Sequence, residues 1–239
     1  MLTVFQNNNL LNESQYAFRN NSSTEQALVN VTEQIYKSID KGKISLLVLL
    51  DLSKAFDNVN HDLLLNKLRQ LNIDSTGFAS YLHDKTHSVK IDKIPSEAQS
   101  NLYGVPQGSI LGPILFNIFI NDIPKMNSLP EITTSTTIYA DDLQLLFSVS
   151  PTNLKQLKIY TETSRNTIKE WYSENGLKMN SNKTQRMLFA TPKFNKRTET
   201  FQIIINYTVR HMEGKVKSLG VIFDSRLFLS FTSNYCAPG

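Results

Sequence analysis

The stretch "ISLLVLLDL", residues 44–52, decides the fold. It is short and almost wholly apolar until it reaches Asp51, and a run of this length and composition is typical of a central β-strand. Folding alone does not need an acid at the end of such a strand. We therefore expect this strand to deliver Asp51 to the edge of the core.

A second strand-like stretch, "TIYADDLQLLFS" at residues 137–148, contains two adjacent acids, Asp141 and Asp142. Neighbouring residues of a strand point to opposite faces, so an uninterrupted strand would bury one of the two charges at a large cost. A turn avoids that cost. We therefore predict strands at 136–140 and 143–149, joined by a tight hairpin whose tip carries both acids.

An aspartate pair alone is a weak signal, because Asp is a common turn residue. If the two strands are neighbours, however, Asp51 and Asp141 converge, and close carboxylates are stable together only when they share a proton or bind cations. Two Mg²⁺ ions held about 3.5–4 Å apart by such acids carry out nucleotidyl transfer. The sequence thus predicts a two-metal site, with Mn²⁺ as an alternative ion.

The remaining elements mix helices and strands without a regular βαβ alternation or a repeat. This pattern predicts an α+β domain with an antiparallel sheet and helices packed on one face. Apolar residues at steps of 3 and 4 predict the helices, and short apolar runs predict further strands. The predicted helices cover 22–42, 61–71, 110–124 and 154–171, and the further strands cover 184–190, 201–207 and 216–223.

Composition limits the class of protein. The chain has 239 residues, a net charge of +4 and 40% hydrophobic residues, which suits one sizeable core and is compatible with nucleic acid. A single cysteine, Cys236, leaves no disulfide partner within the chain. The longest apolar run, residues 44–50, is too short to cross a bilayer. We expect an intracellular protein with no membrane association, and the sequence does not distinguish nucleus from cytoplasm.

Five further stretches follow one another in a distinctive order: "LLVLLDLSKAFDNVNHDLLLNKL" (46–68), "GVPQGSILGPILFNIFINDIP" (104–124), "YADD" (139–142), "NGLKMNSNKTQRMLF" (175–189) and "VKSLGVIFD" (216–224). In order and spacing they closely resemble the palm motifs of reverse transcriptases of non-LTR (LINE-type, jockey-like) retrotransposons. An upstream stretch, "ESQYAFRNNSSTEQAL" at 13–28, resembles the fingers block of that family. The resemblance covers residues 10 to about 227.

The resemblance implies a polymerase palm, an antiparallel sheet with helices on one face, together with partial fingers and no thumb. It also implies a division of the chain into successive segments. These are partial fingers at 1–43, palm at 44–57, a fingers insertion at 58–104, palm through the primer-grip hairpin at 105–225, and a divergent tail at 226–239.

The resemblance assigns the chemistry to a few positions. Asp51 and Asp141 would bind both metals, Asp142 would have a lesser acidic role, and the Leu52 carbonyl would complete one coordination shell. Lys183 matches the lysine that protonates the leaving pyrophosphate or neutralises its charge. A lone lysine is otherwise most often a solvated surface charge.

Residues that contact the nucleotide are implied in the same way. Phe56 matches the bulky residue that excludes a 2′-hydroxyl and so selects dNTPs over rNTPs, although it could be an ordinary core aromatic. Gln107 matches a residue near the nucleotide and template. Gly104 and Gly108 would let the backbone approach these ligands, or would only break the chain before the next helix.

Three further positions have weaker assignments. Asp57 and His61 follow the family pattern "AFDxVxH", and we interpret them as structural, an acid behind the site and a residue at a helix start. Arg19 is a candidate for a template phosphate contact, although arginines near a helix start often pair only with neighbours. The stretch 216–224 would be the hairpin that grips the primer end.

The resemblance also defines what the sequence lacks. Family members carry an earlier fingers hairpin and a helical thumb, which have no counterpart in residues 1–239, so we expect a fragment that retains the acids but polymerises poorly. The expected function is RNA-directed DNA polymerisation, adding dNTPs to a DNA primer on an RNA template. Two alternatives remain: an inactive nucleic-acid-binding remnant, and an unrelated Mg²⁺-dependent phosphohydrolase, which the lack of an activated nucleophile disfavours.

Overall fold

The sheet is built around β1 (Ile44–Leu50), which is buried along its whole length. In this computed structural model it lies inside a four-stranded sheet of order β6-β7-β1-β8, and every neighbouring pair is antiparallel. Its partners are β7 (Asp142–Val149) and β8 (Gln185–Phe189), while β6 (Thr133–Tyr139) forms one edge. The predicted central strand and antiparallel sheet are confirmed.

The structure describes residues 10–83, 85–106, 108–127, 132–194, 201, 203–205, 208–210, 212–225, 227 and 229–231. Among these, no helix is long and apolar enough to cross a membrane. The helices are α2 (Thr24–Asp40), α3 (His61–Gln70), α4 (Thr76–Leu82), α5 (Gly112–Phe119) and α6 (Leu154–Glu174), with short 3-10 turns at Phe56–Asn58, Ile123–Asn127, Pro151–Asn153 and Pro192–Phe194. The short strands outside the main sheet are β2 (Thr86–His87), β3 (Lys90–Ile91), β4 (Ile94–Pro95), β5 (Gln99–Ser100), β9 (Ile203–Ile205), β10 (Thr208–Arg210), β11 (Lys215–Ser218), β12 (Val221–Asp224) and β13 (Leu229–Phe231).

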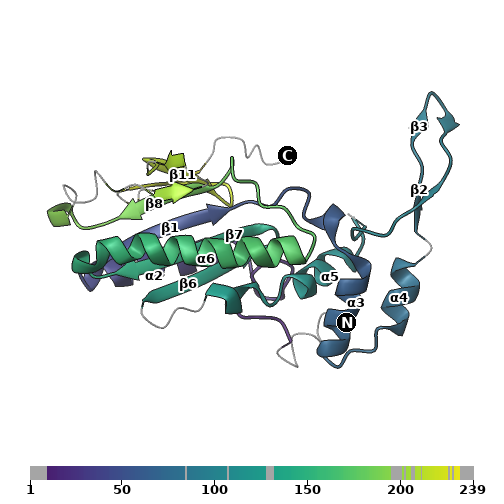
Figure 1. Cartoon of the computed structure of the whole chain (residues 1–239), viewed down its shortest axis with the longest axis horizontal. Coiled ribbons are helices and arrows are strands. Elements are labelled where there is room, and N and C mark those ends of the chain that lie inside the picture. Colours follow the sequence, from purple (N-terminus) through teal and green to yellow (C-terminus); the bar gives the residue numbers. More distant parts are fainter. Residues whose placement is uncertain are drawn as a thin grey trace.

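Helices cover both faces of the sheet, whereas the sequence led us to expect them on one. Leu46, Val48 and Leu50 of β1 belong to the core that includes α6, and Leu47 and Leu49 belong to a second core with α2 and the β11–β12 hairpin. Figure 1 shows α6 lying across the front of the sheet, with α2 behind it. The physical reason is that β1 is apolar at successive positions, so both of its faces need cover.

The helix ends follow from local sequence. Ser23 caps α2 by accepting a hydrogen bond from the Gln26 N–H at 3.3 Å, and Gly42 with φ +65° follows its end. Gly176, with φ +73°, follows α6 in the same way. The two long helices are thus confirmed. The helix predicted at 110–124 is shorter, because α5 ends at Phe119 and a 3-10 turn follows.

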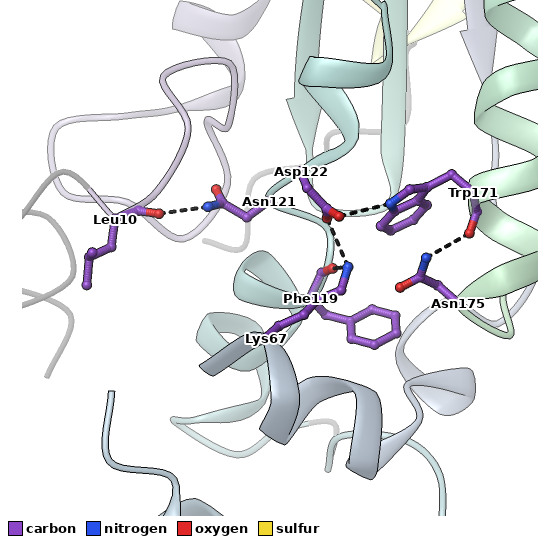
Figure 2. A network of polar contacts seen from close by, with 7 residues as sticks. All are labelled: Leu10, Lys67, Phe119, Asn121, Asp122, Trp171 and Asn175. Atoms are coloured by element: carbon purple, nitrogen blue, oxygen red, sulfur yellow. Dashed lines mark hydrogen bonds and ion pairs between the residues drawn. The ribbon is translucent and has the colours of Figure 1, made fainter. Parts of the chain in front are cut away.

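A network of polar contacts surrounds the end of α5 (Figure 2). Lys67 of α3 donates to the Phe119 carbonyl at 2.7 Å and to Asp122 Oδ1 at 2.9 Å. The other oxygen of Asp122 accepts from the Trp171 indole at 3.0 Å, and the Lys67 ammonium lies 4.4 Å from the centre of the Trp171 ring. Burial lowers the pKa of Lys67, and Asp122 opposes that shift. The network therefore joins α3, α5 and α6 on the face that α6 covers.

Besides the antiparallel β9–β10 pair, two hairpins lie outside the main sheet. The predicted single strand at 216–223 is split into β11 and β12 by a turn at Leu219–Gly220, which gives the hairpin that the family resemblance implied. Strand β13, within the expected divergent tail, pairs with β12. The second hairpin, β2 to β5, projects away from the rest of the molecule as a narrow arm (Figure 1).

Replacing Lys67 by methionine should destabilise the fold. The change keeps much of the side-chain length but leaves the Phe119 carbonyl and one oxygen of Asp122 without their donor, which should cost about 1–3 kcal/mol. Urea unfolding measures this loss. The matched control is Lys37→Met, since Lys37 makes only an exposed ion pair with Glu33, and it should change stability by about 0.5 kcal/mol or less. Equal effects of the two substitutions would contradict a structural role for the network.

Candidate active site

The acidic residues meet where β1 ends and β7 begins. Leu50, at the end of β1, pairs with Leu143, near the start of β7. Asp51 therefore directly follows β1, and Asp142 is the first residue of β7. Because antiparallel neighbours bring the end of one strand to the start of the other, both acids lie at the same end of the sheet. The predicted convergence of the two acidic stretches is therefore confirmed at the level of the backbone.

The turn between β6 and β7 has the predicted length of two residues but is shifted by one residue toward the N-terminus. Tyr139 pairs with Asp142, so the turn contains only Ala140 and Asp141 rather than starting after residue 140. Ala140 has φ +54°, a left-handed conformation that suits a two-residue hairpin turn. As a result, Asp141 lies in the turn whereas Asp142 belongs to the strand.

The acids line two pockets. Asp51, Asp142 and Lys183 line a pocket of about 810 Å³ that also borders β8 and the turn of the β11–β12 hairpin. Asp141 lines a second pocket of about 440 Å³ with Phe56 and other residues. Asp141 and Asp142 thus line two different pockets at the same end of the sheet.

Lys183 lies beside the first acid. Its Nζ atom is 3.4 Å from Asp51 Oδ2, a distance that suits an ion pair better than a hydrogen bond. The lysine side chain is 67% exposed and that of Asp51 is 26% exposed, so the lysine remains free to move toward a ligand. The structure therefore brings Lys183 to the predicted acids; its role in catalysis stays a prediction.

The segment that carries Lys183 also fixes the backbone at Asp51. The Asn180 N–H donates to the Asp51 carbonyl at 2.9 Å, and the Ser53 N–H donates to the Lys178 carbonyl at 2.9 Å. Leu52, between these contacts, forms an isolated antiparallel bridge to the same segment and is buried. Sequence reasoning missed the part played by Asn180, because the contact depends on how two distant segments pair.

Burial and neighbouring charges disfavour the ionised forms of Asp141 and Asp142. Burial raises the pKa of Asp142 to about 6, with Asp141 and Asp51 adding to the shift and Lys183 opposing it. Burial and Asp51 also raise the pKa of Asp141, although less. Asp142 has an exposed surface at the mouth of its pocket, so its desolvation is partial and neighbouring charges matter. A bound cation would relieve this repulsion.

The donor chemistry fits a divalent metal. Carboxylate oxygens are the ligands that Mg²⁺ and Mn²⁺ prefer, and Mg²⁺ needs few protein ligands because it keeps waters and phosphate oxygens. Asp51 Oδ2 is buried and accepts no hydrogen bond from any residue that the structure describes. Within the same described segments, no three acidic, histidine or cysteine side chains are gathered closely enough to form a complete metal site by themselves. Any metal here would therefore need further ligands from water or a substrate.

Phe56 forms one wall of the second pocket. Its ring stacks on Phe116 with centroids 4.1 Å apart and meets the edge of Phe18 at 6.5 Å. Phe56 itself is only partly buried, whereas Phe116 is fully buried. The buried ring beneath it holds Phe56 in place, so Phe56 can present its remaining surface to a ligand beside Asp141.

The structure tests only part of the predictions for the loop at residues 104–108, which contains Gly104 and Gly108. Gln107 lies outside the described residues, but Gly108, with φ +82°, lines the pocket of Phe56 and Asp141. Gly104 has φ +86°, and a Cβ there would lie 3.0 Å from the carbonyl oxygen of Asp57. Gly104 is thus required for a close approach to the protein's own backbone.

The weaker assignments favour structural roles. His61 begins α3 as expected, and its Nε2 atom forms a hydrogen bond of 2.7 Å with the Gly104 carbonyl. Arg19 donates to the carbonyls of Asn12 and Gln15 at 2.8 and 3.1 Å, so its guanidinium fixes a loop. A template contact by Arg19 stays a prediction.

Comparison with known proteins agrees with this architecture. A solved structure of telomerase from Candida tropicalis, in complex with a TWJ fragment of telomeric RNA, matches 98% of this chain and 36% of its own chain with a TM-score of 0.65 at 14% identity. The probable RNA-directed DNA polymerase from transposon BS of Drosophila melanogaster is 30% identical over 91% of this chain. The RNA-directed DNA polymerase from the mobile element jockey of the same species is 27% identical over 90%.

The family model for reverse transcriptase (RNA-dependent DNA polymerase) matches residues 1–223. The chain therefore belongs to the reverse transcriptase family, whose members generally use divalent metals. Its similarity to polymerases of non-LTR retrotransposons agrees with the motifs identified in the sequence. The chain spans about a quarter of the length of these curated relatives, 24% in each case.

The raised pKa of Asp142 predicts a pH-dependent effect of Asp142→Asn. Below pH 3.8, the ordinary pKa, Asp142 is protonated in both the folded and the unfolded protein. Above about pH 6 it is charged in both, and the full cost of burying that charge destabilises the folded protein. In EDTA, the variant should therefore be more stable than the wild type at pH 7.5, with a difference that shrinks toward zero at pH 4. Urea unfolding at the two pH values measures this. The control is Asp92→Asn in the exposed arm, and an equal gain at both pH values for Asp142→Asn would contradict the prediction.

Proposed function

We propose that this chain is the palm and part of the fingers of an RNA-directed DNA polymerase, which adds dNTPs to the 3′ end of a DNA primer on an RNA template. The observation that carries the proposal is the meeting of Asp51, Asp141 and Asp142 at one end of the sheet, with Lys183 beside them. An α+β fold alone would not define this activity. The family and the names of the curated relatives support the same reaction.

In the proposed reaction, Asp51 and Asp141 would hold two Mg²⁺ ions, and the Leu52 carbonyl and Asp142 would assist. When bound, such ions stabilise the charge on the transferred phosphoryl group and activate the attacking hydroxyl. Lys183 carries a proton on Nζ next to Asp51, where it can neutralise or protonate the leaving pyrophosphate. The lysine thus supplies positive charge on the side of the site that faces the first pocket.

Phe56 sets the choice of sugar in this proposal. Its ring lines the same pocket as Asp141 and stacks on Phe116. Because this packing holds the ring in place, a ribose 2′-hydroxyl would clash with it. Gly108 lines the same pocket and adds no side chain to it, and Gln107 is proposed to contact the nucleotide or template. Discrimination then arises from a clash rather than from a favourable contact.

The activity test is Mg²⁺-dependent dNTP incorporation on poly(rA)/oligo(dT) by residues 1–239, beside Asp141→Asn. The substitution should lower incorporation about a thousandfold, since a metal clamp contributes several kcal/mol and each ~1.4 kcal/mol is a factor of ten. Absolute rates should be low, because the chain spans about a quarter of its curated relatives and even a small misplacement of reacting groups lowers the rate. Retained primer-template binding with no incorporation sensitive to Asp141→Asn would favour the inactive-remnant alternative.

Phe56→Ala should admit ribonucleotides. Removing the ring opens space for the 2′-hydroxyl, so the ratio of rNTP to dNTP incorporation should rise about tenfold or more, with a small change in dNTP use. Tyr36→Ala is the control, since this exposed aromatic lies on α2, away from the pocket. An unchanged ratio would identify Phe56 as a core aromatic.

A further inference from the structure

Strand β6 forms an open edge of the sheet, on the side away from β1 (Figure 1). A short segment covers only one end of this edge: the Tyr16 N–H donates to the Ile138 carbonyl at 2.8 Å, and the Ile138 N–H donates to the Ser14 carbonyl at 2.8 Å. These bonds show that the backbone groups of Ile138 point away from β7. The rest of the edge lies between this contact and Thr133.

The alternation of an antiparallel ladder identifies the other outward groups. Residues of an edge strand bond alternately to the neighbouring strand and to the outside, so Thr134 and Thr136 share the outward direction of Ile138. No described residue forms a backbone hydrogen bond to the outward N–H or C=O groups of Thr134 and Thr136. Within the part of the chain that the structure describes, these four strong hydrogen-bonding groups form a row without backbone partners.

A polar pocket of about 400 Å³ lies against this free edge. Its lining includes Thr134, Thr136, Glu13 and Asn127, and none of its lining residues belongs to the candidate active site. Asn127 is only 2% exposed; its Nδ2 atom donates to Thr136 Oγ1 at 3.0 Å. Its Oδ1 atom is buried and has no hydrogen-bond partner among the described residues. A buried amide oxygen of this kind is costly unless a ligand or water satisfies it.

The edge has some protection against strand addition, since residues 14–16 cover one end and the Lys43 Nζ donates to Thr133 Oγ1 at 2.9 Å. The strand itself reads "TTSTTIY" and is rich in threonine, which favours strands. The charged side chain that lines the pocket is Glu13. A ligand that fits this chemistry offers backbone N–H and C=O groups in an extended row and a basic side chain for Glu13.

We propose that the β6 edge is a docking site for an extended segment of a partner protein that carries a lysine or arginine and adds to the sheet as a further strand. Main-chain hydrogen bonds to Thr134 and Thr136 give the segment its affinity, and Glu13 selects its basic side chain. The site does not overlap the candidate active site. Strand β6 connects the two, since it leads directly into the turn that carries Asp141.

The decisive substitution is Thr136→Pro. Proline removes one outward N–H without removing a bond to β7, and edge strands tolerate proline where the N–H faces outward. Thr136→Val is the matched control, because it changes the same side chain but keeps the backbone donor. Circular dichroism and unchanged primer-template binding establish that both variants are folded.

The probe is a phage-displayed library of random heptapeptides, selected on the wild-type chain and, in parallel, on Thr136→Pro and Glu13→Gln. We expect enriched peptides that alternate β-branched residues with lysine or arginine. Synthetic copies should bind the wild type and Thr136→Val with similar affinity, and bind Thr136→Pro roughly tenfold more weakly. N-methylation of alternate peptide nitrogens should abolish binding, and Glu13→Gln should weaken it.

Three results would overturn the proposal. The first is that no peptide is enriched on the wild type over Thr136→Pro. The second is that the enriched peptides are acidic, or bind equally after Glu13→Gln. The third is a concentration-dependent dimer of the wild type that Thr136→Pro abolishes, because the edge would then pair with a second copy of this chain.

Discussion

The pairing of β1 with β7 is the constraint on which the rest of the molecule depends. It fixes Leu50 opposite Leu143, and with that one alignment the acids that follow β1 and precede β7 are brought to a common end of the sheet. The pairing is stable because both faces of β1 are apolar and both are covered, by α6 on one side and by α2 with the β11–β12 hairpin on the other. Burial of these strands thus fixes where the charged residues lie.

Three further elements bring the remaining groups to the same end. The segment after α6 pairs alongside the end of β1 and carries Lys183 to Asp51. The loop before α5 folds back on the turn after β1, through hydrogen bonds from Val105 to Phe56 and from Gly104 to Val59. Phe56 is held from below by a ring of α5. The site is therefore assembled from four separate stretches, none of which forms it alone.

Much of this was predictable from sequence, because the strongest signals are local. The apolar run before Asp51, the capping box of α2 and the glycine after α6 predicted their elements correctly, and the family motifs predicted the β11–β12 hairpin. The placement of α2 and α6 on opposite faces was not predicted, although the unbroken apolar run of β1 contained the signal. The end of α5 before residue 124 had a signal in the sequence, because Pro124 lacks an N–H and disfavours a helix at the residue before it. The contact of Lys67 with Phe119, 52 residues away in the chain, had none.

The two-residue turn at Ala140 and Asp141 has a consequence for how the chain can change in length. One inserted residue there, or in β7, would reverse the face of every later side chain in the strand and separate the acids from their pockets. The β2–β5 arm is different, since its strands pair only with each other. Over evolutionary time, insertions and deletions should therefore accumulate in the arm, while the number of residues between Tyr139 and Leu143 stays constant.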